Sequence, residues 1–416
     1  MKFLIIQPSP DWGGTEELIA TLVSAWRHRV KVWGVSNYPP LIKSWRRSGA
    51  KVIRLPFIPP AASRILRLSM GGGEAPLPLN RREQGSPGRR KPRPSMAGED
   101  VILDIAGDWK GLIKAIMVLP YAVLWYWELL SRAKKAGVNA IILTGFGEKL
   151  LVSWLGSLIK LPVIWFEYPP LKTQFSTNFG LPQILYRASV HLPKLVIAIS
   201  QHTQKSLVSD AGISPDKIRV IYPGVTIPAK VVVTNRPVVG HLSRLTPEKG
   251  QRLLLRAWKQ VIAHIPEAKL KIAGRGPDAT YLKQRVKDLG LTDSVEFLGF
   301  IDDKNSFYRS LKLFVFPTIW EMEGFGLVAA EALSYGLPVV AFDHGPVSEI
   351  VTPKVGILIK KKQPTALAQA IIKLLKDNEA YQSLREQTRK HASTYFNLRL
   401  QSNLILKEIT DVLKTS

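Results

Sequence analysis

Short apolar runs alternate with segments of helical spacing along almost the whole chain, and this alternation restricts the fold more than any other feature. In the first half the strand-like runs are residues 2–8, 30–35, 51–55, 140–145, 162–166, 195–200 and 218–222. In the second half they are residues 238–243, 269–273, 295–299, 311–317, 339–342 and 356–359. Apolar strands separated by helices are typical of buried parallel sheets with right-handed crossovers. The sequence therefore predicts an α/β protein.

The length of the chain favours two domains, because 416 residues are many for a single hydrophobic core. We expect the first domain at 1–228 and the second at 229–395. The helix expected in 396–416 packs back toward the first domain. Residues 71–100 interrupt the alternation with glycines, prolines and clustered arginines, and we interpret them as a disordered basic insertion.

Composition removes several classes of function. The chain has no cysteine, which excludes disulfides and thiolate zinc sites, and its net charge is +26. It has no zinc-finger spacing, RNP-like stretch or basic region followed by heptads, so we expect no nucleic-acid partner. The charge then favours phosphorylated ligands or an anionic membrane surface. Because the first residues resemble a strand and not a secretory signal, we expect a cytoplasmic protein, with peripheral attachment to the membrane left open.

Residues 115–127 form an apolar run of thirteen residues without a charge. The run is too short to span a bilayer and contains Pro120. One interpretation is a buried helix of the first domain. The other is an interfacial helix that places Trp125 and Trp127 at the depth of the lipid headgroups.

The stretch 314–340 reads as a strand, a glycine turn, a helix and a second strand. Two carboxylates, Glu323 and Glu331, are separated by seven residues, and Gly324 and Gly326 lie where the helix begins. Free N–H groups and the helix dipole attract anions at such a helix start. The pattern predicts a site for a ligand that carries both phosphate and hydroxyl groups.

Two cations lie on the corresponding loop of the first strand of the second half. Arg244 and Lys249 are five residues apart, beside Gly250. An arginine fork and a lysine point charge suit a diphosphate. Taken singly, these groups and the two glutamates are ordinary solvated charges. We favour a binding site because they occur together on loops that a parallel sheet brings to one edge.

These motifs resemble those of a retaining glycosyltransferase of family 4. The residues that carry the resemblance are Gly13–Glu16, Gly240–Gly250, Ala273–Pro277, and Glu323–Gly326 through Glu331. The resemblance covers nearly the whole chain and is weakest over 56–140. It implies the GT-B fold, in which two Rossmann-like domains face each other across a cleft.

The resemblance also implies a role for each matching residue. Arg244 and Lys249 would grip the donor diphosphate and stabilise the leaving nucleoside diphosphate, and Glu323 would bind hydroxyls of the donor sugar. Glu331 would bind the ribose. The other donor-binding positions are Gly14 on the N-terminal loop, Gly274 and Arg275 beside the base, and the backbone of Gly324, Phe325 and Gly326. No metal and no cofactor are implied, because protein cations and the helix dipole take that role; the donor, a UDP- or GDP-linked sugar, is a substrate.

The acceptor side departs from the family pattern. Many members carry a histidine after the strand at 162–166, whereas this chain has Glu167 and Tyr168 there. Either Glu167 or Tyr168 takes that position, or the acceptor phosphate or hydroxyl needs no partner there. The expected acceptor is a saccharide or lipid-linked saccharide in cell-envelope polysaccharide or glycolipid assembly.

Three other functions compete with transfer. One is a catalytically inactive sugar-nucleotide-binding partner, and the second is a GT-B nucleotide-sugar 2-epimerase. A nicotinamide dehydrogenase is less favoured, because Gly145–Gly147 lacks the third glycine of the dinucleotide fingerprint.

Overall fold

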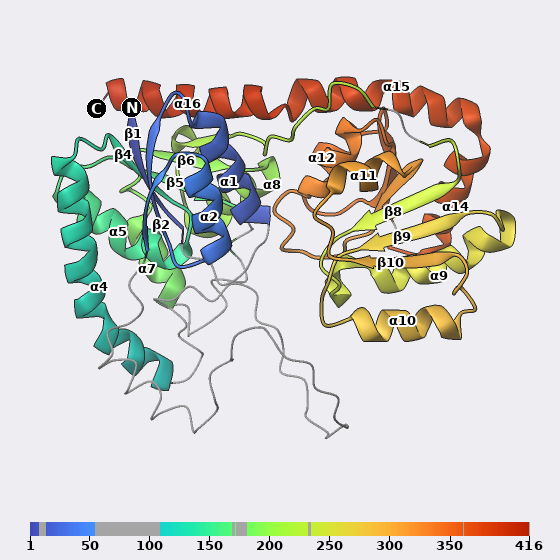
Figure 1. The fold of residues 1–416 in the computed structure, drawn as a ribbon. Helices are drawn as coiled ribbons and strands as arrows, with labels where there is room; N and C mark the ends of the chain where they lie inside the picture. Colours follow the sequence, from blue (N-terminus) through green and yellow to red (C-terminus); the bar gives the residue numbers. More distant parts are fainter. Residues whose placement is uncertain are drawn as a thin grey trace.

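A computed structural model describes residues 1–7, 14–54, 109–168, 171, 181–231, 234–360 and 362–415. The expected basic insertion at 71–100 lies outside these described residues. Figure 1 shows two α/β halves, with the red helices near the C-terminus running along both of them.

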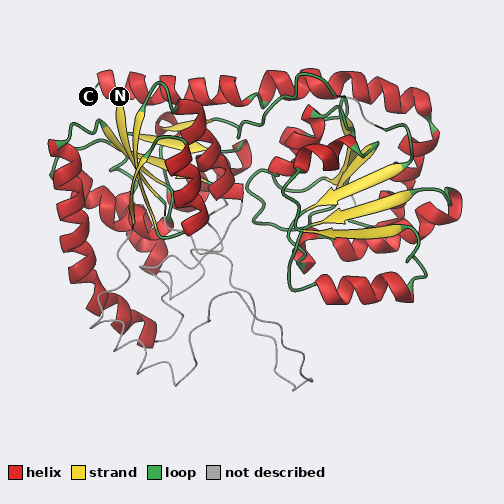
Figure 2. Ribbon diagram, in the orientation of Figure 1, coloured by secondary structure: helices red, strands yellow, loops and turns green. Residues whose placement is uncertain are grey.

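The first half contains a seven-stranded parallel sheet of order β3-β2-β1-β4-β5-β6-β7 (Figure 2). Its strands are β1 (Lys2–Ile6), β2 (Lys31–Ser36), β3 (Lys51–Arg54), β4 (Ala140–Leu143), β5 (Val163–Glu167), β6 (Leu195–Ala198) and β7 (Ile218–Val220). Its helices are α1 (Gly14–Trp26), α2 (Pro39–Arg47), α4 (Trp109–Lys135), α5 (Phe146–Leu158), α7 (Leu181–Ser189), α8 (Gln201–Ala211) and the 3₁₀ turn η2 (Pro215–Lys217). The central strands β1, β4, β5 and β6 are almost wholly apolar and buried, as expected for a parallel sheet that helices cover on both faces.

The second half contains a six-stranded parallel sheet of order β10-β9-β8-β11-β12-β13. Its strands are β8 (Val238–Leu242), β9 (Lys269–Ala273), β10 (Val295–Gly299), β11 (Leu313–Phe316), β12 (Val339–Phe342) and β13 (Gly356–Ile359). Its helices are the 3₁₀ turn η3 (Pro247–Lys249), α9 (Gln251–His264), α10 (Ala279–Asp288), α11 (Lys304–Arg309), α12 (Leu327–Ser334), α13 (Val347–Ile350), α14 (Pro364–Lys376) and α15 (Asn378–Tyr395). The predicted α/β class with two parallel sheets is confirmed.

Each sheet has one point where the strand order reverses. In the first sheet it lies between β1 and β4, and in the second between β8 and β11. Ligands of open α/β sheets bind outside the carboxyl ends of the strands at such points. The loops after β8 and β11 are the ones that carry the predicted cations and Glu323.

The last described helix, α16 (Leu398–Lys414), packs on the first half against α1 and β6. The indole Nε1 of buried Trp26 donates to the Ser402 carbonyl at 3.2 Å. Where the chain returns, Val225 and Asn397 form a parallel bridge, with the Val225 amide 2.6 Å from the Phe396 carbonyl. The two halves are thus connected by two adjacent segments of chain.

Helix α4 is neither fully buried nor fully exposed. Tyr126 and Leu130 are buried in the first core, while Tyr121, Leu124 and Trp127 are exposed. Across the described residues, none of the helices has the length and apolar character needed to cross a membrane.

Candidate functional site

The loop after β8 is held against the loop after β11 by a glycine. Gly250 has φ of 77°, and a Cβ at this position would lie 1.8 Å from the Pro317 carbonyl oxygen. Only glycine fits a left-handed conformation with so close a backbone neighbour. In return, the Ile319 amide donates to the Glu248 carbonyl at 2.9 Å. The two loops at the point of strand reversal therefore form one unit.

This unit brings the predicted donor-site groups together. The Lys249 ammonium lies 2.8 Å from Glu323 Oε2, and both side chains are largely buried. Trp320 lies beside both cations: the centre of its ring is 4.2 Å from Lys249 Nζ and 5.8 Å from the Arg244 guanidinium carbon. The Thr318 hydroxyl lies 3.5 Å from the same Glu323 oxygen. The prediction from sequence missed Trp320 and Thr318, although both lie between the end of β11 and Glu323.

A buried histidine supports the loop from behind. The neighbouring strand residue His241 is 1% exposed, and its Nδ1 lies 3.0 Å from the Val315 carbonyl oxygen. Because a carbonyl only accepts, Nδ1 carries the proton, and Nε2 lies 2.9 Å from the Ser243 hydroxyl oxygen. Burial lowers the pKa of His241 to about 4. This imidazole is therefore neutral near pH 7.

Two glycines shape the start of α12. Gly326 precedes the helix with φ of 105°, and a Cβ on Gly324 would lie 2.5 Å from the Tyr168 carbonyl oxygen of the first half. The Phe325 side chain is buried, where it stacks on Tyr222 and lies edge-on to Phe396. Contact of a ligand with the backbone of this turn stays a prediction.

Glu331 lies within α12 and has two donors from α11. Lys304 Nζ is 3.0 Å from its Oε1, and the Tyr308 hydroxyl is 2.7 Å from its Oε2. Burial raises the pKa of Glu331, and the Lys304 ammonium opposes that rise. Lys304 also contacts Glu17 of α1 in the first half. Sequence analysis missed both α11 residues.

Gly274 and Arg275, predicted to lie beside the base, follow β9. Gly274 has φ of 128°, and a Cβ there would lie 1.8 Å from the Ser243 carbonyl oxygen. Arg275 is exposed, with its guanidinium carbon 5.7 Å from the centre of the Phe300 ring. Phe300 is itself 54% exposed, so an aromatic face that the sequence did not single out lies next to the predicted base position.

The first half places its predicted residues at the facing edge. Gly14 is the first residue of α1; the loop residues before it lie outside the described part of the chain. Glu167 is buried, and its Oε1 is 2.8 Å from Lys149 Nζ and 2.6 Å from the Tyr186 hydroxyl. The structure thus gives Glu167 internal partners, and its acceptor role stays a prediction.

Tyr168, the other predicted acceptor residue, differs from Glu167 in its hydrogen bonding. Its hydroxyl is buried, with no hydrogen-bond partner among the described residues. Burial, reinforced by the charges of Glu16 and Glu167, raises the pKa of this phenol well above its ordinary value. Tyr168 is therefore a neutral hydroxyl. Among the described residues, no cluster of three or more His, Asp or Glu side chains is arranged to hold a metal ion.

The second half of the chain matches the model of a known protein family. Residues 226–391, which contain both loops and Glu331, match the family model "Glycosyl transferases group 1". Through this region, called here the group 1 domain, the chain is similar to the glycosyl transferases group 1 family. The predicted resemblance is confirmed at this level.

Relatives of the group 1 domain are similar over part of their length. The chain is 36% identical to the poly(glycerol-phosphate) alpha-glucosyltransferase of Bacillus subtilis over 156 residues, which are 37% of this chain and 23% of the relative. It is 34% identical over 148 residues to the GDP-mannose-dependent monoacylated alpha-(1-6)-phosphatidylinositol monomannoside mannosyltransferase of Corynebacterium glutamicum, covering 34% of this chain and 38% of that one. The matched part spans well under two thirds of either relative.

Solved structures confirm the fold of the whole chain. Anabaena HepE in complex with UDP is similar over 99% of this chain and 100% of its own, with a TM-score of 0.73 and 21% identity. S. aureus TarM, solved in complex with Fondaparinux, alpha-GlcNAc-glycerol and UDP, is similar over 99% of both chains, with a TM-score of 0.65 and 14% identity. The protein has the GT-B fold, as predicted.

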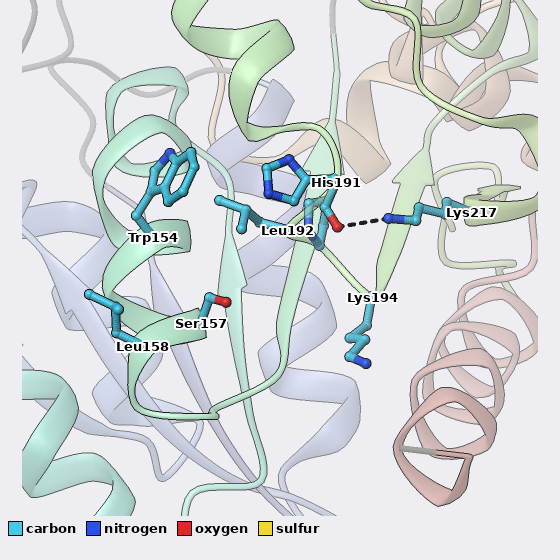
Figure 3. Close-up of a pocket in the computed structure, with 8 residues that line it drawn as sticks. Trp154, Ser157, Leu158, His191, Leu192, Lys194 and Lys217 are labelled. Atoms are coloured by element: carbon cyan, nitrogen blue, oxygen red, sulfur yellow. Dashed lines mark hydrogen bonds between the residues drawn. The ribbon is translucent and has the colours of Figure 1, made fainter.

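Outside the group 1 domain, a pocket of about 500 Å³ opens in the first half (Figure 3). It is lined by Trp154 and Leu158 at the end of α5 and by residues that precede β6 and β7, including His191 and Lys217. Lys217 Nζ donates to the His191 carbonyl at 2.8 Å. These residues lie at the amino ends of the strands, so the pocket is at the opposite edge of the sheet from the predicted site.

Proposed function

We propose that this protein is a retaining glycosyltransferase that moves a sugar from a UDP- or GDP-linked donor to an acceptor hydroxyl. The observation that carries this proposal is the convergence of Arg244, Lys249 and Glu323 where the strand order of the group 1 domain reverses. The names of the relatives, which include glucosyl- and mannosyltransferases, support a hexose as the transferred group.

The geometry suits stabilisation of a leaving diphosphate. Lys249 is held in place by Glu323 and by the face of Trp320, so it is preorganised before any ligand arrives. Arg244 extends from the same loop with its guanidinium near that face. Fixed cations of this kind stabilise the charge that develops on a departing phosphate oxygen, without reorganisation at the moment of reaction. The amide groups at the start of α12 add donors and the dipole of the helix.

Retention follows from attack on the same face as the departing diphosphate. In this mechanism the acceptor oxygen bonds to the anomeric carbon as the bond from that carbon to the phosphate oxygen breaks. The hydroxyl proton passes to the departing phosphate oxygen, so no enzyme nucleophile or general base is required. Glu323 binds donor hydroxyls, and Glu331 binds the ribose. Closure of the two halves excludes water and limits hydrolysis of the donor.

On the acceptor side we assign Tyr168 before Glu167. Glu167 already binds Lys149 and Tyr186, whereas the Tyr168 hydroxyl has no hydrogen-bond partner in the described part of the chain. The Tyr168 carbonyl also lies against Gly324 of the group 1 domain. A neutral phenol there is a donor for a saccharide oxygen or an acceptor phosphate.

A membrane-linked acceptor, as in envelope polysaccharide or glycolipid assembly, fits the surface of the first half. Helix α4 exposes Tyr121, Leu124 and Trp127, and the chain carries a net charge of +26. An amphipathic aromatic surface on a basic protein favours binding to an anionic interface. Cosedimentation with vesicles that contain anionic lipid tests this attachment. We expect Leu124→Ser/Trp127→Ser to lose it, and equal sedimentation of the two proteins would reject it.

The test of the activity measures release of nucleoside diphosphate. UDP- and GDP-sugars are incubated with membrane extract as the source of acceptor, with and without the protein. We expect release that requires both protein and extract, and a decrease on the order of 10²-fold in Arg244→Ala or Lys249→Ala. Exposed Lys259 on α9 provides the matched control, Lys259→Ala, which is expected to behave as wild type. Near-wild-type turnover in both site variants would overturn the diphosphate assignment.

A second function has one observation in its favour. Glu167 is internally paired, and the chain has Glu167 and Tyr168 where the resemblance implies a histidine. This favours a sugar-nucleotide-binding partner without transferase activity. Donor binding without release, with every acceptor source, would select that alternative.

A further inference from the structure

Four polar side chains meet at the junction of the two halves. Lys304 Nζ is 2.5 Å from Glu17 Oε1 and 3.0 Å from Glu331 Oε1. The Tyr308 hydroxyl is 2.7 Å from Glu331 Oε2. Glu17 belongs to the first turn of α1 in the first half, whereas Lys304, Tyr308 and Glu331 belong to α11 and α12 in the second. A single ammonium group therefore connects both halves.

We propose that Lys304 is a positioning residue that holds the Glu331 carboxylate ionised and oriented for the ribose and, through Glu17, makes this orientation respond to closure of the two halves. The inference rests on the proposed function, because it takes Glu331 as the ribose-binding group. It adds a coupling between that group and the helix that follows the predicted donor loop.

The geometry leaves the carboxylate free to bind a diol. Each Glu331 oxygen receives one donor, Oε1 from Lys304 and Oε2 from Tyr308. An ionised carboxylate offers about four acceptor positions, so one position remains on each oxygen. Two neighbouring hydroxyl groups can then donate to Glu331 while Lys304 and Tyr308 stay in place.

Lys304 is also what keeps this carboxylate charged. The Glu331 side chain is 15% exposed, and its partial burial raises its pKa; Lys304 opposes the rise, whereas nearby Glu17 adds to it. Tyr308 donates to the charged form, and burial also raises the pKa of the Tyr308 phenol, which stays neutral. Tyr335, the residue that follows α12, is a further titratable neighbour, and burial raises its pKa too. Without Lys304, Glu331 becomes protonated at a higher pH and accepts poorly from hydroxyls.

The link to the first half is weak enough to open. The side chains of Lys304 and Glu17 are about one third exposed, at 31% and 32%. Exposed ion pairs shift an equilibrium by roughly two- to fivefold. Closure thus gives Lys304 a second partner that fixes its orientation without locking the halves, as release of a nucleoside diphosphate product requires.

The experiment measures binding of UDP and GDP by calorimetry from mildly acidic to mildly alkaline pH. We expect Lys304→Met to weaken binding about tenfold near neutral pH. The loss should shrink as the pH rises, because Glu331 then ionises without its partner. Lys304→Arg, which keeps the charge, should restore most of the affinity. Lys259→Met is the control for loss of an exposed lysine.

Glu17→Gln separates the link between the halves from the charge on Glu331. This variant keeps the Lys304–Glu331 pair, so we expect UDP or GDP affinity within a few fold of wild type, with no new pH dependence. Small-angle scattering should show a larger radius of gyration in the bound state than wild type. Because Glu17 is partly exposed, this variant tests the coupling even if Lys304→Met does not fold.

The outcomes distinguish this inference from the proposed function. If wild type binds neither nucleotide, both are overturned. If wild type binds and Lys304→Met binds equally well at every pH, only the role of Lys304 is overturned. A uniform loss in Lys304→Met that neither high pH nor Lys304→Arg relieves would indicate structural damage and reject a positioning role. An unchanged scattering profile in Glu17→Gln would reject the coupling.

Discussion

Lys249 and Glu323 bind each other in this structure, although the proposed function assigns them to different parts of one ligand. Their side chains are largely buried, so removal of either partner leaves an unpaired charge in a poorly solvated place. The pair therefore positions each group before the donor binds. A glutamine at position 323 keeps a side-chain oxygen that can accept from Lys249, whereas an alanine does not.

At the residue scale, substitution of Glu323 and of Glu331 should affect different steps, transfer in one case and nucleotide binding in the other. Glu323→Gln should reduce transfer by on the order of 10²-fold while binding of the nucleoside diphosphate alone remains close to wild type, because this carboxylate binds the sugar. Glu331→Gln should weaken that binding by about tenfold, because it loses an ionised acceptor for the ribose. Calorimetry and a release assay on the same preparations separate the two. The same losses of transfer and of binding in both variants would contradict the assignment of Glu323 to the sugar and Glu331 to the ribose.

His241 gives a prediction about pH and stability. Its pKa is lowered from 6.5 to about 4 in the folded state, mainly by burial. Between these values the unfolded chain binds more protons than the folded chain. The contribution of His241 to folding stability is therefore fully present above pH 6.5 and falls as the pH is lowered toward 4. The loss from this group is on the order of 3 kcal/mol. Thermal unfolding across this range should show a shallower pH slope in His241→Asn than in wild type; equal slopes would exclude His241 as the source.

The sequence was sufficient to find the charged groups of the site but not their partners. Arg244, Lys249 and Glu323 follow strands that the apolar pattern identifies, and parallel strands bring their ends to one edge. Lys304 and Tyr308 lie on α11, a helix of six residues. Their contacts with Glu331 depend on how α11 packs on α12, which no local pattern encodes. Trp320 was missed for a different reason: an isolated aromatic residue after a strand is usually a packing residue.

At the element scale, glycine turns set the position of the site loops. Gly250 and Gly290 both have positive φ, 77° and 68°, but only Gly250 has a backbone oxygen where a Cβ would go. We expect Gly290→Ala to cost about 1 kcal/mol from the conformation alone. Gly250→Ala should cost on the order of 2–4 kcal/mol, because the clash with Pro317 adds to the strain. It should also weaken diphosphate binding, since it separates the loop of Lys249 from that of Glu323.

Denaturant unfolding and UDP or GDP titration of these two variants check the comparison. If both lose the same stability and keep full affinity, the contact between the loops does not position the site.

Helix α4 shows where periodicity is uninformative. Its apolar residues occur on all sides, so the sequence allowed both a buried and an interfacial helix. In the structure Tyr126 and Leu130 face the core, while Leu124 and Trp127 face outward. A helix that is apolar all round does not reveal which face packs, because that choice depends on its neighbours. The strands were easier to predict, since each is a continuous apolar run with turn residues at both of its ends.

At the scale of the whole molecule, contacts across the junction favour the closed arrangement. Glu349 of α13 accepts from the Gln201 and His202 amides at the start of α8, at 2.7 and 2.8 Å. A carboxylate at a helix start is stabilised by the free N–H groups and the dipole. Glu349→Ala should therefore populate a more open form, with a larger radius of gyration in solution scattering. Asp377, which caps the N-terminus of α15 within the second half, provides the control, Asp377→Ala, which should leave the radius of gyration unchanged.

The return of α16 to the first half has a consequence for biosynthesis. Ribosomes make the first half before residues 398–414 exist, yet Ile405, Leu406 and Ile409 are buried and Trp26 donates to Ser402. Domains usually fold in the order of their synthesis. Here the apolar surface that α16 covers stays exposed on the nascent first half while the group 1 domain is translated. We expect arrested chains that end before residue 398 to bind chaperones and to be cleaved readily by proteases. Chains that include residues 398–414 should release the chaperones and resist cleavage.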